Sequence, residues 1–150
     1  MLRSLLIGLV AGARSMAPLA AVALANQSGR LQRGNGAPGF LDSKAFTVGA
    51  AAMAIGELLG DKMKSAPDRI VAPGIAARLA TGAIAGAAVA PKHERAATMV
   101  IGAAAAVAAS YLTFHLRMKA LHRYGQTASG LVEDAITVGS AVAVVGVNRR

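Results

Sequence analysis

The sequence predicts an all-α protein, an integral membrane helical bundle of about five transmembrane helices that forms a single transmembrane domain over residues 1–150. Hydrophobic residues make up 55% of the chain and charged residues 15%, a balance outside that of soluble domains. Aromatic residues are only 3% and Trp is absent, so small apolar side chains favour close helix contacts over a water-driven core. Most Lys and Arg flank the apolar segments, as anchoring to lipid headgroups requires.

Five apolar segments predict the helices. Only the fourth is free of charges over nearly the ~20 residues that a membrane span requires, and each of the others contains at least one charged residue. Short polar connections with Gly and Pro separate them. The segments are Leu5–Ala25, Ala45–Lys62, Ile70–Ala90, Ala96–Leu116 and Ala128–Val147.

The first segment resembles a secretory signal in its outline, with Arg3 before an apolar run and small residues near Ala25. Arg14 argues against this interpretation, since the apolar core of a signal is uncharged. Pro18 follows soon after. We therefore expect the segment to be retained as a helix of the bundle.

Two further patterns concern topology. Ala13-Arg14 and Ala77-Arg78 are each followed by a run of small residues, which suggests an internal two-helix repeat of the kind found in transporters. With five crossings, the Lys and Arg divide equally between the two faces, so the positive-inside rule gives no orientation. This equal division could reflect dual topology, with antiparallel pairing in a homodimer. It would also result if one of the five spans is misassigned.

Charged residues within the apolar segments are the candidate site. From a rise of about 1.5 Å per residue, five of them lie in the same half of the bilayer: Arg14, Glu57, Arg78, Glu133 and Asp134. Charges at this depth are costly unless they meet one another or a water-filled cavity. Asp61 follows Glu57 by four residues and shares its helical face.

Other residues are expected to support this cluster. Pro18 removes the helical hydrogen bond to the Arg14 carbonyl and would open the helix there. The supporting polar residues are Ser15, Lys62, Asp68, Arg69 and Thr81, of which Ser15 and Thr81 fit a helix hydrogen-bonding role equally well. Glycines four residues apart, Gly8 with Gly12 and Gly82 with Gly86, predict close helix packing.

Several function classes are disfavoured. The chain has no Cys, and it contains no GxSxG, Walker or HExxH motif. Gly74–Arg78 is similar to part of the motif of membrane CDP-alcohol phosphotransferases, but the metal-binding aspartates of that motif are missing. The net charge of +9 comes without the aromatic residues typical of nucleic-acid binding. We therefore expect no nucleic-acid partner, no cofactor and no assigned metal, and a protein that is not an enzyme more readily than one that is.

Five motifs in order resemble one known family: GARSMAP at 12–18, GELLGDK at 56–62, SAPDR at 65–69, ARLATGAIAGA at 77–87 and LVEDA at 131–135. They are similar to the bacterial membrane-protein family catalogued as domain of unknown function 4126, and the resemblance covers nearly the whole chain. It implies a multi-pass protein of the bacterial inner membrane with no activity to carry over. The characteristic positions would fall on Arg14, Pro18, Glu57, Asp61, Lys62, Pro67, Asp68, Arg69, Arg78, Glu133 and Asp134.

Three functions remain open at this point. The favoured one is a small transporter or channel-like protein in which Arg14 and Arg78 bind an anionic solute or lipid headgroup, and the carboxylates act as counter-charges or proton acceptors. The second is an accessory or structural membrane protein whose ion pairs order the helices. The third is a metal-dependent membrane enzyme acting on lipid or isoprenoid phosphates, with Mg²⁺ on Glu57, Asp61, Asp68 and Glu133.

Overall fold

A computed structural model of the chain describes residues 1–60 and 71–146, and over these ranges it is helical, which confirms the all-α prediction. One isolated β-bridge joins Asn35 and Pro91. The helices are α1 (Leu2–Ala13), α2 (Met16–Gln27), η1 (Gly39–Asp42), α3 (Lys44–Gly60), α4 (Ala72–Ala88), η2 (Lys92–Glu94), α5 (Arg95–Tyr124) and α6 (Gln126–Gly146).

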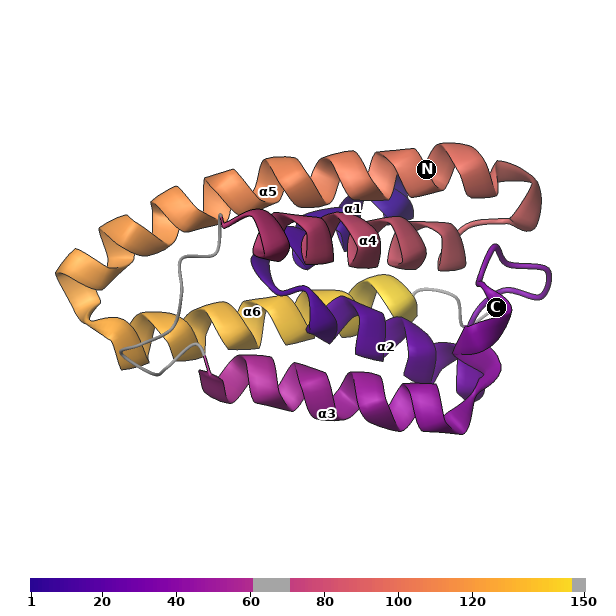
Figure 1. Ribbon diagram of the computed structural model, residues 1–150, viewed down its shortest axis with the longest axis horizontal. Coiled ribbons are helices and arrows are strands. Elements are labelled where there is room, and N and C mark those ends of the chain that lie inside the picture. Colours follow the sequence, from indigo (N-terminus) through magenta and orange to yellow (C-terminus); the bar gives the residue numbers. More distant parts are fainter. Residues whose placement is uncertain (61–70, 147–150) are drawn as a thin grey trace.

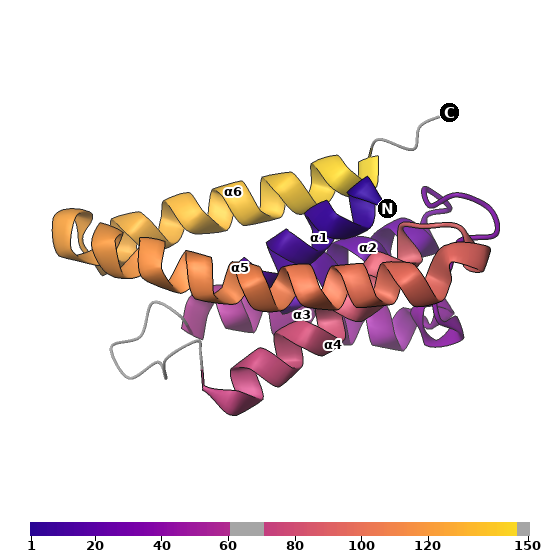
Figure 2. The ribbon, with the colours of Figure 1, turned by 90° about the horizontal axis from the view of Figure 1, so that it is seen from above.

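The first predicted helix is wrong as a single element, because α1 ends at Ala13 and α2 begins at Met16. Arg14 between them is extended, with φ −141° and ψ 119°. The chain turns back there, so that α1 and α2 form a short helical hairpin whose tip is Arg14 and Ser15 (Figures 1 and 2). Pro18 in the first turn of α2 has no N–H to donate back toward Arg14, which favours this break.

Hydrogen bonds place both outer ends of this hairpin at one end of the bundle. Near the start of α1, the Ser4 hydroxyl donates to the Gly86 carbonyl at 2.8 Å. After α2, the Gly36 N–H donates to the Ala90 carbonyl, also at 2.8 Å. Gly86 lies in the last turn of α4 and Ala90 lies just after this helix, and we call this end of the bundle the loop end. The α1–α2 hairpin therefore enters from the loop end and returns to it.

The remaining long helices run along the bundle and reverse at its ends (Figure 1). α5 and α6 meet at Gly125, whose φ of +80° suits glycine, and we call this the turn end. The basic stretch from Arg117 to Arg123 belongs to α5, although the sequence pattern placed it in a connection. Because α1 and α2 together do not cross the bundle, Arg3 lies at the loop end, whereas the five predicted crossings placed it on the same face as Arg117 and Arg123.

Glycines allow α1 and α4 to pack closely on α5, as predicted. A Cβ at Gly8 would lie 2.5 Å from the Gly102 carbonyl oxygen, and one at Gly86 would lie 2.6 Å from the Thr98 carbonyl oxygen. Gly12, one turn later in α1, and Gly82, one turn earlier in α4, make similar approaches to α5. The backbones therefore touch where any side chain would separate them.

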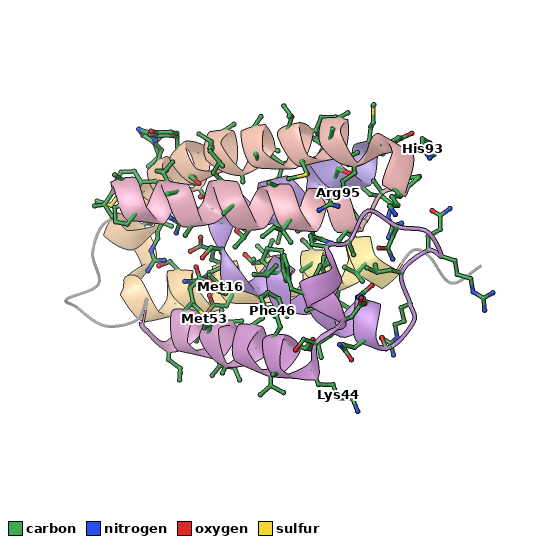
Figure 3. All side chains as sticks on the ribbon, turned by 45° about the vertical axis from the view of Figure 1, so that its right-hand side comes forward. Met16, Lys44, Phe46, Met53, His93 and Arg95 are labelled. Carbon is green, nitrogen blue, oxygen red and sulfur yellow. The ribbon has the colours of Figure 1, made fainter. Side chains whose placement is uncertain are left out.

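α3 packs along α2 through small residues. Ala50 and Ala54 of α3 contact Ala20 of α2, and Met16 and Phe46 pack against them (Figure 3). Buried positions on α3 recur every three or four residues from Thr47 through Ala50 and Ala54. Continued by three residues, this pattern brings Glu57 onto the same face, opposite the start of α2.

Two helices of the described ranges are long and apolar enough to cross a membrane, Lys92–Ala120 and Ala128–Gly146. α3 and α4 have 17 residues each, or about 25 Å of helix, and fall short of that length. The two Arg-bearing segments also differ in their backbone, since α4 runs unbroken through Arg78 while the chain breaks at Arg14. The two-helix repeat stays a prediction.

Candidate functional site

Arg14 lies at the tip of the α1–α2 hairpin and is only 1% exposed. Its Nη2 atom donates to the Oδ1 atom of Asp134 on α6, and its Nη1 atom reaches the backbone carbonyl of Glu57 at 3.5 Å. Asp134 belongs to the buried face of α6, which continues through Thr137 and Ala141. A buried guanidinium and a buried carboxylate from distant parts of the chain therefore form an ion pair at the tip.

Glu57 of α3 binds the other side of the tip. Its Oε1 atom accepts hydrogen bonds from the backbone N–H of Ser15 at 2.9 Å and from the Ser15 hydroxyl at 3.0 Å. Its Oε2 atom accepts from the backbone N–H of Met16 at 2.8 Å. Ser15 does not cap α2 with its own side chain. The Glu57 carboxylate thus caps α2 from another helix, where free N–H groups and the helix dipole favour an anion.

Arg14, Glu57 and Asp134 lie at one level, roughly half-way along the bundle. Arg14 follows 12 residues of α1, and Asp134 lies at a comparable distance from the loop end of α6. At 1.5 Å per residue, each is about 18 Å from the loop end. Glu57, near the far end of α3, lies about 20 Å from it. The midplane of a ~30 Å hydrocarbon layer would lie about 15 Å from its surface, which is close to the distance of these residues from the loop end.

Arg78 of α4 is also buried, at 6% exposure. Gly82, one turn later, approaches Gly102 and Ala106 of α5, and Gly12 of α1 approaches Ala106 as well. Arg78 therefore lies at about the level of Gly12, close to the tip of the α1–α2 hairpin. The hydroxyl of Thr81 donates to the Arg78 carbonyl at 3.3 Å, a bond within its own helix, whereas Ser15 is a donor in the site.

The structure separates Glu133 from Asp134, which the sequence pattern grouped together. Successive residues on a helix point about 100° apart, so that Asp134 faces Arg14 while Glu133 faces α5. There its Oε2 atom accepts from the Nη1 atom of Arg117 at 3.2 Å. Sequence reasoning missed Arg117 because it ended the fourth helix at Leu116. Leu112 and Leu116 were already inside the predicted segment, and the basic residues from Arg117 onward were assigned to a connection.

Four predicted residues, Asp61, Lys62, Asp68 and Arg69, lie outside the described residues, as does Pro67 of the family resemblance. In the ranges 1–60 and 71–146, no group of three or more His, Asp or Glu side chains is arranged to hold a metal ion. Glu57 and Glu133 bind different donors on different helices. Both carboxylates therefore accept hydrogen bonds from protein donors in this arrangement.

A cavity of about 570 Å³ lies between α5 and α6 beyond the tip. At the loop end, α1 packs against both of these helices. α1 stops at Ala13, which lines the cavity, so α1 itself does not fill the space between α5 and α6 toward the turn end. The half-length of α1 therefore creates both the buried tip and the cavity below it.

Comparison with protein-family models, curated proteins and solved structures gives no match to this chain. The resemblance to the domain of unknown function therefore stays a prediction. Any functional conclusion has to come from the geometry of the tip and its surroundings.

Proposed function

We propose that this chain is a small multi-pass membrane transporter for an anionic solute, coupled to protons, with its site at the tip of the α1–α2 hairpin. One observation carries the proposal: the Glu57 carboxylate sits on the N-terminal N–H groups of α2, next to the guanidinium of Arg14. The Glu57 carboxylate thus occupies a position that would also suit an anion from solution. Discontinuous helices with their N-termini near mid-bilayer bind anionic groups in many transporters.

The distribution of polarity supports membrane insertion. Buried positions include Arg14, Arg78 and Asp134, whereas many large apolar side chains of the outer helices are exposed. A helical bundle in lipid is expected to have its charged groups inside and its apolar groups outside. On α3, α5 and α6 these side chains include Val48, Met53, Ile55 and Leu59, Val100 and Leu112, and Leu131, Ile136 and Val142 respectively. The bacterial inner membrane is the proposed location.

A labelling experiment tests this topology, and the absence of native Cys makes it direct. Leu2→Cys, before the tip, and Gln32→Cys, after α2, should react with a membrane-impermeant maleimide to the same extent in right-side-out vesicles. Lys119→Cys, near the turn end, should show the complementary extent. If both orientations coexist, the first two still match. A difference between Leu2→Cys and Gln32→Cys would show that the first segment crosses the membrane.

Protonation of Glu57 is the proposed coupling step. A neutral carboxyl group loses most of its attraction for the α2 N-terminus. The N–H groups of Ser15 and Met16 and the Ser15 hydroxyl then become donors for a solute anion. Asp134 holds the Arg14 guanidinium beside these donors. Return of the Glu57 carboxylate, after it loses its proton, expels the anion.

Reactivity of a cysteine at the tip tests this step without knowledge of the solute. Ser15→Cys should react with an anionic methanethiosulfonate faster than with a cationic one, because Arg14 and the α2 N-terminus attract negative charge. The Glu57→Gln substitution, which replaces the carboxylate by a neutral amide, should raise the rate with the anionic reagent.

The matched control is Ser4→Cys, because Ser4 is also buried but donates to the Gly86 carbonyl between packed helices. It should stay unreactive in the same vesicles. Equal, negligible rates at positions 4 and 15 at every pH would contradict a solute site at the tip.

The second candidate is the structural role, and a specific observation favours it as well. The charges of the site already bind one another: Arg14 pairs with Asp134, and Arg117 pairs with Glu133. Such pairs suffice to fix helix order in a dry interior. No comparable contact among the described residues favours the metal-dependent enzyme.

A further inference from the structure

The cavity between α5 and α6 is open along one side and has mainly hydrocarbon walls. Leu116 of α5 and Val132 and Ile136 of α6 line it, and all three side chains are more than half exposed. Small residues on both walls, Ala120 of α5 and Ala128 of α6, allow another helix to approach the backbones closely. We call the cavity with its open side the α5–α6 groove. An exposed apolar surface of this kind is typical of a contact with another molecule.

The groove also contains a pair of opposite charges. The Nη1 atom of Arg117 donates to the Oε2 atom of Glu133 at 3.2 Å, and both residues line the groove. Their side chains are 12% and 18% exposed. α6 has 21 residues, or about 31 Å of helix, which matches a hydrocarbon layer of ~30 Å. Glu133 lies about 10 Å from the turn end of α6, so the pair would lie within that layer, beside the open side of the groove.

Lipid chains cover such a pair poorly. Hydrocarbon offers neither a hydrogen bond nor a counter-charge, so partly exposed charges at this depth are costly. Phospholipid headgroups lie at the membrane surface, about 10 Å from the level of the pair. The element that covers the groove therefore has to bring polar groups to this depth, which a helix of a protein chain can do. A second copy of this chain supplies them, because it contains the same pair at the same level.

The positions of the two charges favour one symmetry for such a contact. In a two-fold pair whose axis runs parallel to the bundle, α5 of each copy faces α6 of the other, and levels along the bundle are kept. Arg117 then faces the partner's Glu133. In an antiparallel pair with its axis at this level, α5 would face α5, and Arg117 would face the partner's Arg117. Opposite charges therefore favour the parallel pair, whereas like charges disfavour the antiparallel one.

We propose that two copies of this chain associate through the α5–α6 groove as a parallel homodimer, in which the two Arg117–Glu133 pairs form one cluster of four charges. Both copies then have the same orientation in the membrane, unlike the copies of a dual-topology pair. This inference relies on the proposed function only for the membrane setting, because neither Ser15 nor Glu57 of the tip lines the groove.

Disulfide cross-linking in native membranes tests the interface and its symmetry, since the chain has no native Cys. Leu116→Cys and Val132→Cys are produced separately and together, as copies with different tags. In a parallel homodimer α5 faces α6, so the two variants should cross-link to each other several-fold more than either cross-links to itself. Val48→Cys, on the exposed face of α3, is the matched control and should give no comparable product.

Charge reversal tests the cluster of four charges. Arg117→Glu leaves two carboxylates in the groove, and Glu133→Arg leaves two guanidinium groups. Energy transfer between labelled copies in lipid vesicles should show that these two variants bind each other at least about tenfold more tightly than either binds itself, a preference of 1.4 kcal/mol or more. A chain with both substitutions should regain self-association. Lys119→Glu, on the same helix but outside the lining of the groove, is the control and should associate like the wild type.

A wild-type protein that stays monomeric at every protein-to-lipid ratio would overturn the proposal, since lipid chains would then fill the groove. Preferential cross-linking of Leu116→Cys to itself would overturn the parallel symmetry, and equal affinities among the charge variants would overturn the cluster. These measurements use no transport step and leave the tip unaltered. An inert cysteine at position 15 in a dimeric protein would contradict the proposed transport but leave this interface standing, and a reactive one in a monomeric protein would do the reverse.

Discussion

Arg14→Gln is expected to abolish proton-coupled anion uptake by the reconstituted protein. The substitution removes the guanidinium that lies 1% exposed at the tip and pairs with Asp134. Without it, a solute anion near mid-bilayer loses its main counter-charge. Uptake of chloride, inorganic phosphate and succinate would be measured in liposomes with an entrapped pH-sensitive dye. A folded Arg14→Gln protein with wild-type uptake would contradict a site at the tip.

Stability has to be measured in the same variants, because breaking a buried ion pair is itself costly. Arg14→Gln leaves the Asp134 carboxylate buried without its guanidinium, at a cost of about 3–5 kcal/mol. Arg14→Met with Asp134→Leu removes both charges, and it should recover most of that loss in a detergent unfolding titration. The double variant should nonetheless fail to transport. Wild-type uptake by the double variant would favour the structural alternative.

Gly102→Ala is expected to give the largest loss of stability among glycine substitutions on the helices. A Cβ at position 102 would lie 2.2 Å from the Gly82 carbonyl oxygen and 3.1 Å from the Gly86 Cα atom. α4 would have to move away from α5, and such overpacking costs about 1–3 kcal/mol or more. Gly102→Val should be worse. Unfolding midpoints by circular dichroism in detergent measure the effect.

The control is Gly139→Ala on α6, where an added Cβ meets nothing within 4 Å. That variant should be unchanged or more stable by up to about 1 kcal/mol, because Ala is the better helix former. Equal stability of the two variants would mean that α4 and α5 do not pack as closely as their backbones indicate.

The residues of the tip could be predicted in part from the sequence. Arg14, Glu57 and Asp134 were identifiable because each interrupts an apolar segment, where an uncompensated charge is costly. The partners of each residue were not identifiable. Glu133 and Asp134 are adjacent in the chain, yet they face α5 and the tip respectively, and only the rotation of α6 within the bundle decides this.

Composition and apolar periodicity by themselves determined the helical class, the approximate bounds of α3, α4 and α6, the start of α5 and the close glycine contacts, because these depend on short-range backbone geometry. The tertiary structure alone decided that the first segment is a hairpin. An apolar run of about 20 residues is compatible with one helix or with two short ones. What favours two is the capping of α2 by Glu57 from α3. The free N–H groups at a helix break have to be satisfied by a partner distant in sequence, and no local pattern encodes that partner.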